Sequence, residues 1–129
     1  MKHSIQHIGD IQLLVDAFYY KVRKDSMLAP LFNEVIKDNW EGHLKKMCTF
    51  WGTVLLGTSS YYGNPFMPHV NLAVEKDHFE RWVFLFDQTL NENFEGEKAE
   101  EAQWRANKMA EMFHLKIKSF NTNNRKTLI

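Results

Sequence analysis

Apolar residues recur at intervals of three and four along most of the chain, which is the spacing of helices with one buried face. The first such stretch follows Asp10, which we predict to be the N-cap of a helix. Tyr19 lies four residues after Val15 and three before Val22, so its hydroxyl is expected at the edge of the buried face or inside it. The predicted buried face contains Ile11, Leu14, Val15, Phe18 and Val22.

A short helical turn and a second long helix are predicted next. Pro30 is expected to begin the turn, which carries Leu31, Phe32, Val35 and Ile36. The residues from Asp38 to Glu41 have the spacing of a capping box, although Asp stands where Ser or Thr is usual. The following helix is predicted to end at Gly57, because glycine readily adopts the left-handed conformation that closes a helix. Its stripe contains Trp40, His43, Met47, Phe50, Trp51 and Val54.

Two further helices are predicted over about residues 75–91 and 97–120. Residues 58–68, between the helix that ends at Gly57 and the helix that begins near residue 75, are rich in Ser, Tyr, Gly and Pro. They are predicted to form a loop long enough to have a function. Residues 121–129 are polar and are expected to fray. The sequence has no alternating strand pattern, internal repeat or linker. We therefore predict an all-α fold, with one domain over residues 1–129 and a core over about 10–120.

Composition and charge mainly exclude functions. Lys plus Arg and Asp plus Glu number 16 each, so no broad basic field is expected to recruit nucleic acid. No apolar run approaches the roughly 20 residues that span a bilayer, and residues 1–7 lack the apolar stretch of a secretion signal. We therefore expect a cytoplasmic protein without a membrane partner. The single cysteine, Cys48, excludes an internal disulfide framework.

Common catalytic and metal-binding motifs are missing from the sequence. It has no Cys-x-x-Cys or His-Glu-x-x-His, no Gly-rich phosphate loop and no Gly-x-Ser-x-Gly. Glu75 and His78 have the Glu-x-x-His spacing of di-iron bundles once, without a second copy. The aromatic content of 14% fits either a ring-rich core or the wall of a site for a flat cofactor. The residue pattern alone does not decide between these alternatives.

Two histidines in unlike settings, amid aromatic residues, carry a family resemblance. The sequence resembles the group III truncated haemoglobins from about residue 10 to 120, and it lacks the Gly-Gly pairs that are typical of groups I and II. The resemblance rests on Phe18-Tyr19-Tyr20-Lys21-Val22-Arg23-Lys24-Asp25, Leu31-Phe32-Asn33, His43 with Phe50-Trp51, Pro68-His69 and Phe79-Glu80-Arg81-Trp82.

The resemblance implies a two-over-two helical sandwich around haem b (iron protoporphyrin IX). The family's proximal histidine, which holds the iron, falls on His69. On the ligand side, the family's distal groups fall on Tyr19, His43 and Trp82. The expected cofactor-binding residues are Phe32, Lys46, Met47, Phe50, Phe66 and Met67, of which Phe66 and Met67 are placed only by their position before His69.

The implied function is reversible binding of dioxygen, with nitric oxide, carbon monoxide and cyanide as further small ligands. Three candidate donors beside a bound dioxygen predict slow release, which suits ligand chemistry or sensing better than transport. One alternative is that the same haem acts as a nitric oxide dioxygenase or a weak peroxidase, which would require a separate reductase. A second alternative is a helical interaction module without a cofactor, in which the aromatic rings only form the core.

Overall fold

The computed structural model describes residues 2–58 and 75–127, the last nine of them by their backbone only. These ranges contain the helices α1 (Ile8–Lys24), α2 (Leu28–Ile36), α3 (Trp40–Leu56), α4 (Lys76–Asn93) and α5 (Glu97–Thr127). Within the described ranges, the only β-type pairing is a single bridge between His3 and Phe94. The predicted all-α class is confirmed. None of the described helices is long and apolar enough to cross a membrane.

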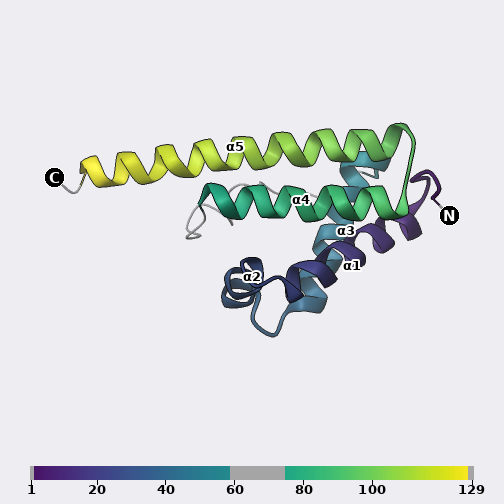
Figure 1. Cartoon of the computed structure of the whole chain (residues 1–129), viewed down its shortest axis with the longest axis horizontal. Helices are drawn as coiled ribbons and strands as arrows, with labels where there is room; N and C mark the ends of the chain where they lie inside the picture. Colours follow the sequence, from purple (N-terminus) through teal and green to yellow (C-terminus); the bar gives the residue numbers. More distant parts are fainter. Residues whose placement is uncertain (1, 59–74, 128–129) are drawn as a thin grey trace.

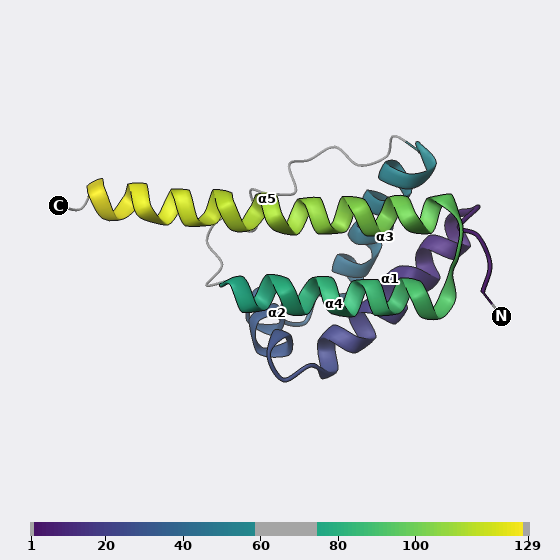
Figure 2. The same cartoon turned by 45° about the horizontal axis from the view of Figure 1, so that its top comes forward.

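The helices form two packed pairs. α1 packs against α3, and α4 packs against α5, while α1 also contacts α4 and α3 contacts α5. α2 packs against the α1 side of this arrangement and also reaches α4. Figures 1 and 2 show α4 and α5 running side by side, with α5 extending beyond the start of α4. This is the predicted two-over-two arrangement.

The predicted cap of the first helix is wrong by three residues. α1 begins at Ile8 with His7 as its N-cap, and Asp10 lies inside the first turn. The Asp10 carboxylate accepts hydrogen bonds from the backbone N–H groups of Gln6 and His7, at 2.9 and 3.2 Å. The preceding segment is held in turn, because the Glu95 N–H donates to the His3 carbonyl at 3.1 Å. The helix starts earlier because these contacts order residues that sequence periodicity leaves outside it.

The starts of the next two helices also differ from expectation. α2 begins two residues before Pro30, where Asp25 accepts hydrogen bonds from the Met27 and Leu28 N–H groups at 3.1 and 3.0 Å. α3 begins at Trp40 after Asn39, and no side chain caps it. The predicted capping box at Asp38 is therefore wrong.

The ends of α3 and α5 can be compared with the sequence-based prediction. Gly57 closes α3 in the left-handed conformation with φ of 69°, as predicted. α5 continues to Thr127, so the expectation of fraying is wrong for residues 121–127. The sequence from Glu97 to Thr127 contains neither Gly nor Pro, so it lacks the residues that most strongly terminate a helix.

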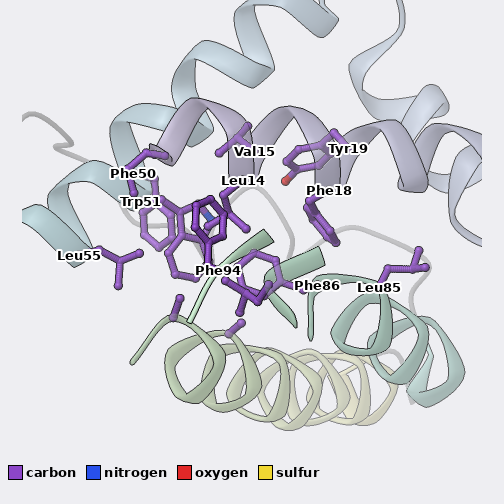
Figure 3. Close-up of a cluster of buried hydrophobic side chains, with 14 of the residues drawn as sticks. Leu14, Val15, Phe18, Tyr19, Phe50, Trp51, Leu55, Leu85, Phe86 and Phe94 are labelled. Atoms are coloured by element: carbon purple, nitrogen blue, oxygen red, sulfur yellow. The ribbon is translucent and has the colours of Figure 1, made fainter. Parts of the chain in front are cut away.

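The core is built from the predicted stripes and is rich in aromatic rings. Phe86 of α4 stacks on Trp51 of α3, with ring centroids 5.0 Å apart, and meets the edge of Phe18 of α1 at 5.1 Å. Figure 3 shows Leu14, Val15 and Phe18 of α1 above Phe86 of α4. One aromatic cluster thus joins three helices, which is the packing that fixes the cavity described next.

Candidate functional site

A cavity of about 360 Å³ lies beside the aromatic core and is lined by residues of all five helices. Every predicted site residue that lies within the described ranges contributes to its wall: Tyr19, Phe32, His43, Lys46, Met47, Phe50 and Trp82. Further lining residues are Leu28, Leu31, Val35, Ile36, Asn39, Gly42, Trp51, His78, Phe79, Met109, Ala110 and Phe113. The wall is mainly apolar, with a few polar groups, which is the usual character of cofactor and small-molecule sites.

Tyr19 brings a hydroxyl from α1 into this apolar setting. Its side chain is buried, and its ring meets the edges of Phe18 and Phe32 at centroid distances of 4.8 and 6.1 Å. Burial raises the pKa of the Tyr19 hydroxyl well above its ordinary value, because the charged phenolate would lose its solvation. Tyr19 therefore keeps its proton at neutral pH and is a hydrogen-bond donor.

His43 faces Tyr19 from the first turns of α3. The two ring centroids are 5.0 Å apart and the ring planes are nearly perpendicular, at 89°. The Nε2 atom of His43 is buried. Lys46 and Met47 follow three and four residues later, so they lie on the same face of α3 and line the same cavity. The Lys46 residue as a whole is exposed, which places its charged end near the rim.

Trp82 enters the cavity from α4 and is fixed by rings on two sides. Its indole stacks on Phe86 with centroids 5.4 Å apart and an interplanar angle of 5°, and it meets Phe18 at 5.3 Å in an edge contact. Phe86 is itself stacked on Trp51. Trp82 is therefore the last ring of the stack Trp51–Phe86–Trp82, and packing in the core sets its position.

α2 carries Phe32, and an ion pair ties the start of this helix to α4. The Arg81 Nε donates to Asp25 Oδ1 at 2.6 Å, while the other oxygen of Asp25 accepts from the backbone at the start of α2. Burial acts to raise the pKa of Asp25, but the hydrogen bonds from Arg81 and from the Leu28 and Met27 N–H groups outweigh it and hold the pKa below its ordinary value. These contacts hold the start of α2, the helix that carries Phe32, against α4, the helix that carries Trp82.

Among the lining residues that were not predicted as site residues, His78 and Phe79 come from the first turns of α4. The sequence drew attention to His78 only through its Glu-x-x-His spacing with Glu75, whereas the structure places it in the wall of the cavity together with Phe79. The Glu75 N–H donates to His78 Nδ1 at 3.0 Å, which leaves Nε2 to carry the proton of the neutral ring. Phe79 is one of the residues that carry the family resemblance, but it was not predicted as a site residue. Helical periodicity gives no signal for the role of His78, because this residue lies in the first turn of α4 at the margin of its apolar stripe.

The predicted iron ligand is not among the described residues. His69, Phe66 and Met67 all lie outside the described ranges, as does most of the predicted loop over residues 58–68. The roles assigned to these three residues therefore stay predictions.

The cavity and its helices can be compared with known proteins. Residues 5–117 match the family model of the bacterial-like globins. A group 3 truncated hemoglobin of Campylobacter jejuni subsp. jejuni is 38% identical over 95 residues, which are 70% of this chain and 75% of that protein. The chain belongs to the group III truncated haemoglobins.

A solved structure agrees with this assignment. The crystal structure of a group III truncated hemoglobin from Campylobacter jejuni has a TM-score of 0.84 with this chain at 34% identity, and the match covers 91% of this chain and 95% of that one. A group III truncated haemoglobin fold thus places helices from all parts of the chain around one cavity, which agrees with the sequence-based prediction of the fold.

Proposed function

We propose that this chain binds haem b in the cavity and reversibly binds dioxygen on the side of Tyr19, His43 and Trp82. The observation that carries the proposal is the convergence of these three residues, from α1, α3 and α4, on one cavity of about 360 Å³. A volume of this size lies in the range of about 300–1,000 Å³ that is usual for cofactor pockets. Family membership supports the same interpretation.

The residues that are present fit a porphyrin. A flat apolar macrocycle needs apolar walls, and Phe32, Met47 and Phe50 provide them from α2 and α3. The porphyrin also carries carboxylates, which suit a cation near the rim, where Lys46 lies. A few donors among apolar groups match the character of a distal haem pocket.

In this proposal His69 would hold the haem iron, an assignment that rests on the family resemblance, and Phe66 and Met67 would contribute to the same side of the site. Haem, once bound, would supply an iron that can take a diatomic ligand, and dioxygen held there would gain partial negative charge that hydrogen-bond donors of this chain could stabilise. A neutral imidazole is a suitable donor to iron.

The distal residues act as hydrogen-bond donors. Tyr19 retains its proton because it is buried, and Trp82 carries an indole N–H in a position fixed by Phe86. A hydrogen bond to a charged partner is worth about 1.5–3 kcal/mol, which corresponds to about ten- to a hundredfold slower ligand escape for each effective donor. Carbon monoxide carries less charge, so the same donors should retain it less.

The first experiment is the absorption spectrum of the purified chain after incubation with haemin. We expect a strong Soret band and, after reduction, reversible shifts with dioxygen and carbon monoxide. His69→Ala should lose the ferrous spectrum of an imidazole-ligated haem, while the control His114→Gln should keep it. A folded chain that takes up no haem would overturn the proposal and favour a cofactor-free helical module.

Turnover distinguishes a binding protein from an enzyme at the same site. Sustained nitric oxide consumption or peroxidase activity with a separate reductase would assign the enzyme function. A single stoichiometric reaction of the oxygenated protein would not, because it needs no renewed supply of electrons.

A further inference from the structure

The His43 imidazole lies in a slot between two aromatic rings. Tyr19 of α1 meets it with centroids 5.0 Å apart and an interplanar angle of 89°, and Trp40 of α3 meets it at 5.9 Å and 87°. The rings of Tyr19 and Trp40 also contact each other, with centroids 6.1 Å apart, so each of the three rings contacts the other two. A movement of Tyr19 or Trp40 therefore changes the space that is available to His43.

Trp40 is in turn fixed from two other helices. Its indole N–H donates to the Asn33 Oδ1 of α2 at 3.1 Å, and the Arg23 guanidinium of α1 lies 4.7 Å from the centre of its ring. Trp40 is 8% exposed although it is the first residue of α3. The first turn of a helix is usually prone to fray, and no side chain caps α3. The contacts of Trp40 are therefore what holds this end of the helix against α1 and α2.

We propose that Trp40 is a positioning residue for His43, and that Asn33 and Arg23 lock Trp40 in place. The locked indole holds the imidazole inside the cavity next to Tyr19, so that His43 leaves the cavity only when Trp40 moves. The consequence for ligand entry rests on the proposed function, whereas the placement of His43 itself does not require a cofactor. The arrangement links the position of His43 in α3 to the position of α2.

The contribution of the lock follows from the size of its contacts. One net hydrogen bond shifts an equilibrium between two positions of His43 by about two- to tenfold. The cation–π contact of Arg23 adds an effect of similar or smaller size. Loss of the Asn33 acceptor should therefore increase the fraction of molecules with His43 outside the cavity by about two- to tenfold.

Three variants separate the lock from general packing. Trp40→Phe keeps an aromatic ring and removes the N–H donor. Asn33→Ala removes only the acceptor, at an exposed position where folding should be unaffected. Trp104→Phe is the matched control, because Trp104 is 60% exposed on α5 and lies outside the slot.

The first measurement is the proton NMR shift of the His43 ring in the full chain, assigned by comparison with His43→Gln. Two neighbouring aromatic rings displace this resonance from its random-coil position. We expect Trp40→Phe and Asn33→Ala to move it back toward that position, and Trp104→Phe to leave it unchanged. This measurement does not depend on haem uptake, so it separates a failure of the lock from a failure of the proposed function.

The second measurement is the rate of carbon monoxide association after flash photolysis of the haem-loaded chain. We expect Trp40→Phe and Asn33→Ala to raise this rate by about two- to tenfold, while dioxygen dissociation, which depends on Tyr19, changes less. An unchanged His43 resonance together with an unchanged association rate in both variants would overturn the proposal. So would equal changes in the Trp104→Phe control.

Discussion

Asp25 should contribute more to stability than any exposed acidic residue, because it joins three elements of the fold. Its side chain is only 6% exposed. One oxygen accepts from the Arg81 Nε at 2.6 Å, and the other accepts from the Met27 and Leu28 N–H groups at the start of α2. Replacing it therefore loosens α2 at one end and its connection to α4.

The expected cost differs between two substitutions. Asp25→Asn keeps an oxygen for the backbone donors but loses the charge that faces Arg81. A hydrogen bond between charged groups is worth about 1.5–3 kcal/mol. The Arg81 side chain is 41% exposed and can recover water, which lowers the net loss to about 1–2 kcal/mol. Asp25→Ala also removes the acceptor for the start of α2, which adds about 0.5–2 kcal/mol.

The assay is thermal and urea unfolding at a fixed haem content, because a bound cofactor stabilises the folded state by mass action. Each kcal/mol should lower Tm by about 4 °C in a chain of this size. Glu111→Gln is the matched control, since it removes an acid from an exposed pair with Lys108 at 3.8 Å and should cost less than about 0.5 kcal/mol. A double-mutant cycle with Arg81→Met isolates the energy of the pair.

The pH dependence gives a second test of the same reasoning. The folded-state pKa of Asp25 is held below its ordinary value. Its stabilising contribution is therefore complete above the unfolded-state pKa of about 3.9 and is lost as pH falls through the lower folded-state pKa. The stability difference between the parent and Asp25→Asn should shrink below about pH 4. A difference that stays constant from pH 7 to pH 3, or a cost no greater than that of Glu111→Gln, would refute the argument.

Three further predictions follow from other parts of the fold. Tyr19→Phe should speed dioxygen dissociation by about ten- to a hundredfold and carbon monoxide dissociation much less, measured by ligand replacement; equal effects on both gases would argue against a hydrogen bond. Gly57→Ala should lower the free energy of unfolding by about 1–2 kcal/mol, because φ at Gly57 is 69°, whereas Gly57→Asn should cost less. Asp10→Asn should cost about 1–2 kcal/mol in urea unfolding, because the carboxylate accepts from the Gln6 and His7 N–H groups. Burial acts to raise the pKa of Asp10, but these hydrogen bonds and one from His3 outweigh it and lower the pKa. The cost of Asp10→Asn should therefore become smaller when the pH is lowered below about 4. A cost that stays the same at low pH would contradict the prediction.

Sequence pattern predicted most of the helices but misplaced the starts of α1 and α2. Periodicity and Gly57 placed α3 and α4 to within about two residues, because buried faces repeat every 3.6 residues and glycine closes helices. The errors at Asp10 and at Pro30 have one cause. Each helix starts where a carboxylate meets backbone donors that other parts of the chain hold in place. Such contacts leave no periodic signal.

The amino-acid pattern established which faces of the helices are buried, and the family resemblance indicated the candidate site residues. The packing of the helices brings Tyr19, His43 and Trp82 to one cavity. It also brought His78 into that cavity and set Trp40 between His43 and α2. The physical reason is that periodicity reports that a side chain is buried, whereas its partner depends on how separate helices pack. The packing of α1, α3 and α4 around Phe86 is a property of the folded chain as a whole.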